Sequence, residues 1–140
     1  MTNAFHLNDF ETYQNNNPYM KYNHIELCSV GEQRSVVRVK LVPESKNLHG
    51  VVHGGLLYSL ADCVAGVTAR ANGDDYVTQS EHMNFLRNTH DGTIYSEGTV
   101  VKRGRRLAII HVTVYDQNHL LLADGVVDMI RMHQPQEAAK

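Results

Sequence analysis

The sequence predicts an α+β protein in which one antiparallel sheet curls around a single long helix. Three observations support this prediction. One apolar segment near the middle of the chain has helical periodicity, segments with strand character stand on both sides of it, and short, turn-like links join the later strands. Because a single helix cannot cover both faces of a sheet, a doubly wound parallel fold is excluded.

The N-terminal region is expected to contain one short helix followed by two strands. The helix should cover about Asp9 to Gln14, since Asn8 and Glu11 have the spacing of a capping box, and "NNNPY" should end it. Residues 25–42 then have the character of two strands joined near Gly31. In the second of these strands, the apolar residues Val37, Val39 and Leu41 alternate with charged residues. One face of this strand is therefore expected to be exposed to solvent.

The long helix is expected to begin at Gly54 or Gly55 and to end at Asn72–Gly73, where a glycine suits a left-handed C-cap. A four-strand antiparallel meander should follow, over residues 76–86, 93–102, 106–115 and 120–132. The tail "HQPQEAAK" is expected to fray. The chain of 140 residues should therefore form one domain with a core over about residues 24–132. The uncovered edges and face of such a sheet favour an oligomer.

Composition and charge limit the class of protein. A net charge of -2 weighs against a nucleic-acid-binding protein, which is usually basic. Cys28 and Cys63 lie far apart and form no CxxC motif, so a disulfide framework is not expected. The N-terminus lacks the pattern of a secretory signal, and no stretch approaches the roughly 20 apolar residues that span a bilayer. The sequence therefore predicts a soluble, cytoplasmic protein with no nucleic-acid or membrane partner.

The long helix has two distinct faces. One is apolar and consists of Leu57, Leu60, Ala61, Val64 and Ala71. The other has small residues around a single carboxylate and consists of Gly55, Ser59, Asp62, Gly66 and Ala69. The carboxylate has two interpretations: a solvated or ion-paired group on a packing face, or a reactive group. The N–H groups at the Gly54–Gly55 helix start favour the second, because an oxyanion site together with a carboxylate suggests acyl chemistry.

A longer motif extends this observation. The pattern N-x-x-G-x-x-H-G-G-x-x-x-x-L-x-D-x-x-x-G, residues 47–66, resembles the signature of hot-dog-fold acyl-CoA thioesterases of the PaaI-like, phenylacetate-pathway family. The resemblance continues through "SEHMNFLRNTHDGTIYSEGTVVKRGRR" and covers about residues 45–130. It implies a hot-dog fold, a homodimer with active sites at the interface, assembly into a homotetramer, and hydrolysis of an acyl-CoA thioester.

The resemblance also implies roles for individual residues. Asp62 would be the general base or nucleophile, and the Gly54 N–H would polarise the thioester carbonyl. Asn47 would orient the carbonyl or the attacking water, Ser80 would assist at that water, and His53 would hold the loop that sets the Gly-Gly backbone. The groups before the helix would lie opposite Asp62 and Ser80 of the neighbouring subunit. A carboxylate in a drier interface is a stronger base.

The basic sequence "KRGRR", residues 102–106, has three interpretations: a solvated hairpin tip, a nucleic-acid patch, or a site for the phosphates of coenzyme A. The resemblance implies the last, and arginine suits phosphate because it forms bidentate hydrogen bonds. The contacts with coenzyme A are then expected from Gly55, Gly104, Arg105 and Arg106. Coenzyme A is part of the substrate, so no separate cofactor is expected.

Other reactive side chains are given minor roles. His49 and His53 are four residues apart, but they precede the helix and no further ligand has matching spacing, so no metal site is expected. Cys63 has no neighbouring base and is expected to be a small buried residue rather than a nucleophile.

Glu81 and His82 are more polar than the wall of an apolar acyl pocket. If they face the site, the acyl group carries a polar substituent; strand alternation alone does not decide this.

Two other functions are compatible with the same fold. One is a hot-dog protein that binds acyl-CoA without hydrolysing it, as a sensor or carrier. The other is a hot-dog dehydratase, whose different Asp–His motif is missing here. The set of Asn47, Gly54 and Asp62 favours an enzyme over a binder, because a binder needs no helix carboxylate beside the carbonyl. The acyl group is left open between aryl, hydroxyaryl and medium-chain aliphatic groups.

Overall fold

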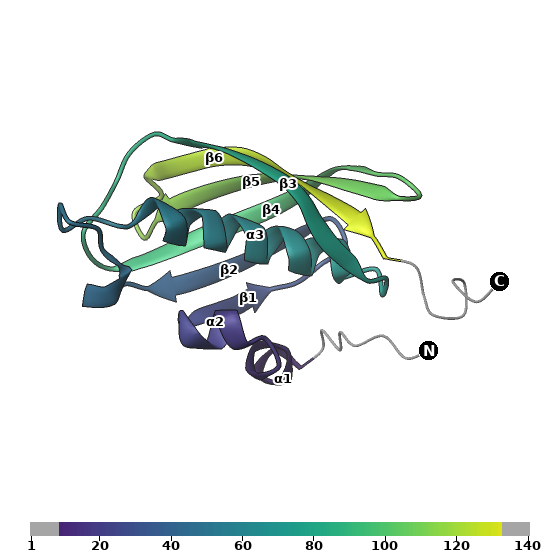
Figure 1. Cartoon of the computed structure of the whole chain (residues 1–140), viewed down its shortest axis with the longest axis horizontal. Helices are drawn as coiled ribbons and strands as arrows, with labels where there is room; N and C mark the ends of the chain where they lie inside the picture. Colours follow the sequence, from purple (N-terminus) through teal and green to yellow (C-terminus); the bar gives the residue numbers. More distant parts are fainter. Residues whose placement is uncertain (1–8, 133–140) are drawn as a thin grey trace.

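The computed structural model describes residues 9–132, and at its centre helix α3, Gly54–Arg70, lies against a six-stranded antiparallel sheet (Figure 1). The strands are β1 Ile25–Ser29, β2 Arg34–Lys40, β3 Tyr76–Phe85, β4 Thr93–Arg103, β5 Leu107–Asp116 and β6 Leu121–Arg131. The predicted α+β arrangement, with one sheet around one long helix, is confirmed. The predicted frayed tail lies outside the described residues.

Two short helices, not one, precede the sheet. Helix α1, Phe10–Asn15, is capped by Asp9, whose side chain accepts a hydrogen bond from the Thr12 N–H; the expected cap, Asn8, lies outside the described residues. Helix α1 ends within "NNNPY", as predicted, but the same segment also starts a second helix that was not predicted, α2, Pro18–Tyr22. The Asn17 side chain caps α2, and the proline occupies the first turn, where its missing N–H costs nothing.

The strand order is β1-β2-β4-β5-β6-β3, so the predicted four-strand meander is wrong for its first strand. β4, β5 and β6 do form a meander, but β3 pairs with β6 at the sheet edge, and β4 pairs with β2. The physical reason lies in the loop after β3. It hydrogen-bonds to the segment before α3, through Thr89 O with the Val52 N–H and Asn88 Nδ2 with Val52 O, instead of forming a hairpin.

The apolar face of α3 forms the core. Leu57, Leu60, Ala61 and Val64 are buried against the concave face of the sheet, as the helical spacing predicts. Gly98 of β4 lets the helix approach closely, since a Cβ there would lie 3.0 Å from Thr68 Oγ1. The helix ends at Arg70, shortly before the predicted Asn72, and Gly73 has the predicted positive φ of 95°. Ala71 therefore caps the helix and is not part of its apolar face.

The two edges of the sheet differ. Helices α1 and α2 cover the β1 edge, where Tyr13 and Met20 are buried (Figure 1). At the other edge, no described residue pairs with the outer side of β3, a strand of 10 residues that exposes Val77 and Phe85. An edge of this length is a template for pairing with another chain. Within residues 9–132, no helix is long and apolar enough to cross a membrane.

Candidate active site

Asp62 lies halfway along α3 and is half-buried. Its Oδ1 accepts a hydrogen bond from Thr78 Oγ1 of β3 over 2.5 Å. This bond fixes the carboxylate at the wall of a cavity of about 340 Å³. The cavity is lined by Tyr19, Tyr58, Ser59, Asp62, Cys63 and Glu81.

A second carboxyl group, that of Glu81, faces this cavity. Burial, together with the nearby charge of Asp62, raises the pKa of Glu81 to about 8, so the group holds a proton at neutral pH. Its Oε2 is buried and has no hydrogen-bond partner among the described residues. His82, the next residue, is exposed, as strand alternation requires. The orientation that the sequence left open is thus decided: Glu81 faces the cavity and His82 does not.

One alternative to carboxylate chemistry, a cysteine nucleophile, is weak in this geometry. Cys63 packs against the core, as expected, and burial raises the pKa of its thiol to about 12, so the reactive thiolate is absent near neutral pH. In the described part of the chain, no three histidine, cysteine, aspartate or glutamate side chains come together as a metal site.

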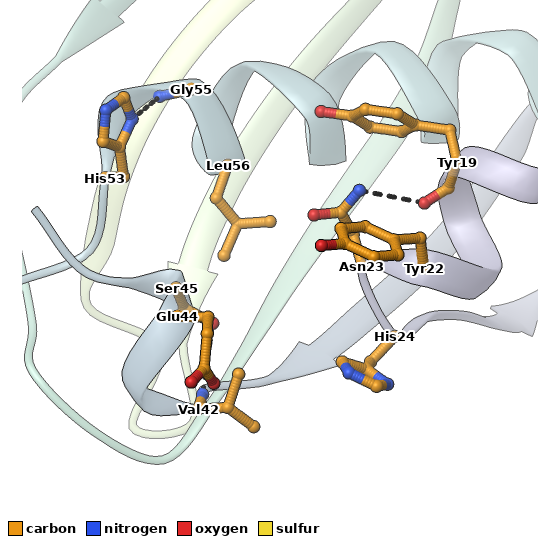
Figure 2. Close-up of a pocket in the computed structure, with 10 residues that line it drawn as sticks. All are labelled: Tyr19, Tyr22, Asn23, His24, Val42, Glu44, Ser45, His53, Gly55 and Leu56. Carbon is orange, nitrogen blue, oxygen red and sulfur yellow. Dashed lines mark hydrogen bonds between the residues drawn. The ribbon is translucent and has the colours of Figure 1, made fainter.

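The two glycine N–H groups at the start of α3 differ, because among the described residues the Gly55 N–H is engaged and the Gly54 N–H is not. His53 is the N-cap, and its Nδ1 accepts a hydrogen bond from the Gly55 N–H over 2.8 Å (Figure 2). The Leu56 N–H reaches back to the His53 carbonyl. The Gly54 N–H has no partner within residues 9–132. At the positive end of the helix dipole, this N–H can stabilise an oxyanion.

Asn47 stabilises the loop in which it lies by hydrogen bonds to the backbone of that loop. Its side-chain Oδ1 accepts hydrogen bonds from the His49 and Val51 N–H groups, over 2.8 and 3.4 Å, and its N–H donates to the Val51 carbonyl. These contacts hold the segment that leads to His53. The structure does not join Asn47 to Asp62 of the same chain.

Ser80 and Asp62 are not brought together either. The Ser80 hydroxyl donates a hydrogen bond to Asp128 of β6 over 3.0 Å. The cause is an irregularity in β3, where the register with β6 shifts between Thr78 and Ser80. The shift breaks the simple alternation of faces, so that Thr78 and Glu81 both reach the α3 side. Sequence reasoning missed Thr78, because periodicity does not reveal where a strand bulges.

The first arginine of "KRGRR", which is not one of the predicted phosphate contacts, has a structural role. The Arg103 guanidinium binds the carbonyl oxygens of Ala69, Thr68 and Glu32 over 2.9–3.2 Å, and so caps the C-terminal end of α3. Its Cζ also lies 6.0 Å from the centre of the Tyr76 ring. The hydrogen bonds to the end of α3 therefore explain one of the basic residues in "KRGRR" without any ligand.

Gly104, Arg105 and Arg106 form the turn between β4 and β5, and both of these arginine side chains are exposed. Arg103 joins this turn to the C-terminal end of α3, whereas Gly55 lies at its N-terminal end. With 17 residues, α3 is about 25 Å long. The residues expected to contact coenzyme A therefore lie at opposite ends of the helix within one chain.

The expected oxyanion donor and the expected base are also separated. Gly54 and Asp62 are eight positions apart on α3, which corresponds to about 12 Å along the axis. One thioester carbonyl cannot contact both groups of the same chain.

A larger cavity of about 600 Å³ opens between α2 and the start of α3 (Figure 2). It is lined by Tyr19, Tyr22, Asn23, His24, Val42, Glu44, Ser45, His53, Gly55 and Leu56. Tyr19 borders both cavities, and its hydroxyl lies 2.6 Å from Ser59 Oγ, which donates to the Gly55 carbonyl. Sequence reasoning missed Tyr19, because α2 was not predicted.

The small-residue face of α3 is thus divided. Gly55, Ser59 and Asp62 line the two cavities. Gly66 instead makes room for the Arg70 side chain, which passes close over it and binds the Tyr13 hydroxyl and the Tyr76 carbonyl. Only the first half of this face is open to a ligand.

Comparisons with known proteins agree with this architecture. The profile of the thioesterase superfamily matches residues 49–123. A curated relative from Saccharolobus solfataricus, named as a candidate esterase, is 26% identical over 118 residues, which are 83% of this chain and 84% of the relative.

Solved structures give the same result. The PaaI protein of the E. coli phenylacetic acid degradation operon has a TM-score of 0.83 at 23% identity, covering 88% of this chain and 90% of that protein. This likeness confirms the hot-dog fold. A hypothetical thioesterase of Streptococcus pneumoniae, solved with coenzyme A, has a TM-score of 0.75 at 26% identity, covering 82% of this chain and 98% of that protein.

Proposed function

Because the chain belongs to the thioesterase superfamily, we propose that it hydrolyses acyl-CoA thioesters to a free acid and coenzyme A. The observation that carries this proposal is the Asp62 carboxylate, held by Thr78 at the wall of a cavity. A carboxylate in this position can activate water or attack a carbonyl carbon itself.

In the proposed reaction, the thioester carbonyl accepts a hydrogen bond from the Gly54 N–H, which stabilises the oxyanion as it forms. Asp62 either removes a proton from the attacking water or forms an anhydride that water then hydrolyses. The thiolate of coenzyme A leaves and takes up a proton. Thr78 keeps one oxygen of Asp62 fixed, so that the other oxygen faces the reacting atoms.

The site is proposed to need two copies of the chain. About 12 Å separates Gly54 and Asp62 along α3 of one chain. A two-fold partner can supply the missing half, with Asn47, His53 and Gly54 of one protomer against Asp62 and Ser80 of the other. The open β3 edge supports such a dimer, and we propose that dimers associate further into a tetramer.

Coenzyme A is proposed to bind with its phosphates at the β4–β5 turn, through Gly104, Arg105 and Arg106, and with Gly55 near the thioester. The exposed arginines suit phosphate groups. The Streptococcus pneumoniae protein, solved with coenzyme A, supports a coenzyme A site on this fold. A cytoplasmic location fits a substrate of this kind.

The test is release of free thiol from a panel of acyl-CoA and aryl-CoA thioesters by the purified protein. Turnover above the background rate supports the enzyme. Binding of the same thioesters without release of thiol would instead support a non-catalytic acyl-CoA binding protein.

A further inference from the structure

The cavity around Asp62 contains a carboxyl group that the proposed mechanism does not use. Glu81 projects from β3 into this cavity, and its Oε2 is buried without a hydrogen-bond partner among the described residues. A buried polar oxygen without a partner destabilises a protein, so its presence beside a candidate base needs a reason. A ligand group that pairs with this oxygen is such a reason.

The described side chains around Glu81 do not supply a hydrogen-bond partner for its Oε2. From α3, Asp62 accepts its hydrogen bond from Thr78, and the Cys63 thiol stays protonated. From α2, the Tyr19 hydroxyl is engaged by Ser59. The ring of Tyr58 forms another wall, packed edge to face against Phe85 with ring centres 5.6 Å apart. Within the described residues, no cation lines this cavity.

The protonation state of Glu81 defines what it can bind. With its pKa near 8, the group is a neutral carboxylic acid at pH 7. It then has one O–H donor and an acceptor oxygen. A hydroxyl group of a ligand matches both, since it accepts one hydrogen bond and donates another. A second anionic group on the ligand would be repelled by Asp62, and an ammonium group would meet a neutral partner.

We propose that Glu81 selects acyl groups that carry a hydroxyl on the second or third carbon, as in 2-hydroxyacyl and 3-hydroxyacyl thioesters. The position follows from the shared cavity. If Asp62 lies beside the carbonyl carbon, then Glu81, which lines the same cavity, faces the first carbons of the acyl chain. This inference rests on the proposed thioesterase function and adds a substrate class to it.

The decisive experiment compares 3-hydroxybutyryl-CoA with butyryl-CoA, which differ only in the hydroxyl group, and repeats the comparison with a 2-hydroxyacyl pair. The wild-type protein should favour a hydroxylated substrate in kcat/KM by at least about 100-fold, because a buried polar group left unpaired by the plain substrate rejects it. Glu81→Leu should abolish this preference, because kcat/KM rises for butyryl-CoA once no polar group is left unpaired and falls for 3-hydroxybutyryl-CoA, whereas Glu81→Gln, which still forms hydrogen bonds, should keep part of the preference.

The control variant is His82→Ala, on the next residue of the same strand but facing away from the cavity; it should leave the preference unchanged. An equal loss on both substrates in Glu81→Leu would overturn the proposal, because Glu81 would then act through Asp62 or a partner chain. A wild-type protein with no preference for the hydroxyl would overturn it as well.

A binding measurement separates this proposal from the proposed function. Thioether analogues of the two substrates cannot be hydrolysed, and calorimetry reports their Kd directly. If the protein releases no thiol at all but binds the hydroxylated analogue at least about 100-fold more tightly, the thioesterase function fails and the role of Glu81 stands. Equal Kd values for the two analogues would show that Glu81 does not select hydroxylated acyl groups.

Discussion

The Thr78 hydroxyl donates a hydrogen bond to Asp62 over 2.5 Å and thereby connects the edge strand β3 with the middle of α3. The bond is exposed in the single chain, on the same side as the open sheet edge. An exposed hydroxyl–carboxylate bond contributes little to folding, so its value is expected in function, where it orients a carboxylate.

Replacing Asp62 should remove activity and leave the fold intact. Asp62→Ala deletes a half-buried carboxylate beside small residues, and alanine has the highest helix propensity. Loss of a general base costs about 10²- to 10⁴-fold in rate, so kcat should fall at least about 100-fold. Asp62→Asn should be nearly as inactive, since the amide neither accepts a proton nor attacks. Thiol release measures the rate, and circular dichroism measures the fold.

One pair of results would contradict a catalytic role for Asp62. If Asp62→Ala unfolds while Asp62→Asn keeps full activity, the residue is a structural hydrogen-bond acceptor. Single-turnover hydrolysis of the wild-type protein in ¹⁸O-labelled water tests for the nucleophile: label in the Asp62 carboxylate shows an anhydride that water opens at the Asp62 carbonyl, because a general base does not acquire the label.

Thr78 should act as a positioning residue. Thr78→Val keeps the shape but removes the donor to Asp62, so kcat should fall about tenfold, the lower end of what misplacing a catalytic group costs, while KM stays nearly constant. Thr78→Ser restores the hydroxyl and should restore most of kcat. Failure of serine to rescue would show that the methyl group, not the hydrogen bond, matters at this position.

Glu81 should make stability depend on pH. Its pKa is raised from 4.5 to about 8 in the folded state, so the folded protein binds a proton that the unfolded chain has lost. The stability of the wild-type protein relative to a non-titrating variant is then highest below pH 4.5 and falls as the pH rises through about 8. The difference in Tm, Glu81→Gln minus wild type, should therefore increase between pH 5 and pH 9. A difference that is the same at both pH values would contradict the buried position of Glu81.

The open edge of β3 predicts an oligomer. In size-exclusion chromatography with light scattering, the protein should elute as a dimer or larger at micromolar concentration. Val77, 45% exposed on this edge, should become buried on pairing, so Val77→Lys should weaken the assembly and reduce activity together. Tyr95→Phe, on the opposite half of the sheet, is the control. A stable, active monomer would exclude a site shared between two chains.

The sequence by itself determined what depends on neighbouring residues. The helix that starts at Gly54, its apolar face from Leu57 to Val64, and the positive φ of Gly73 follow from local spacing and backbone freedom. The positions of the strands followed in the same way, because alternation and turn residues are local signals. These elements were sufficient to predict one antiparallel sheet around one long helix, and the Gly-Gly motif with Asp62 was sufficient to indicate where a candidate site should lie.

Only the tertiary structure decided which residues meet. Periodicity does not predict that β3 pairs with β6, because this pairing depends on the loop after β3, which hydrogen-bonds to Val52. A bulge in β3 then brings Thr78, rather than Ser80, to Asp62 and turns Glu81 into the cavity. The pKa of Glu81 follows from that burial, so it has no counterpart in the sequence. Strand pairing, the bulge and the burial of Glu81 all depend on contacts between residues that are far apart in the chain. Local sequence patterns do not reveal such contacts.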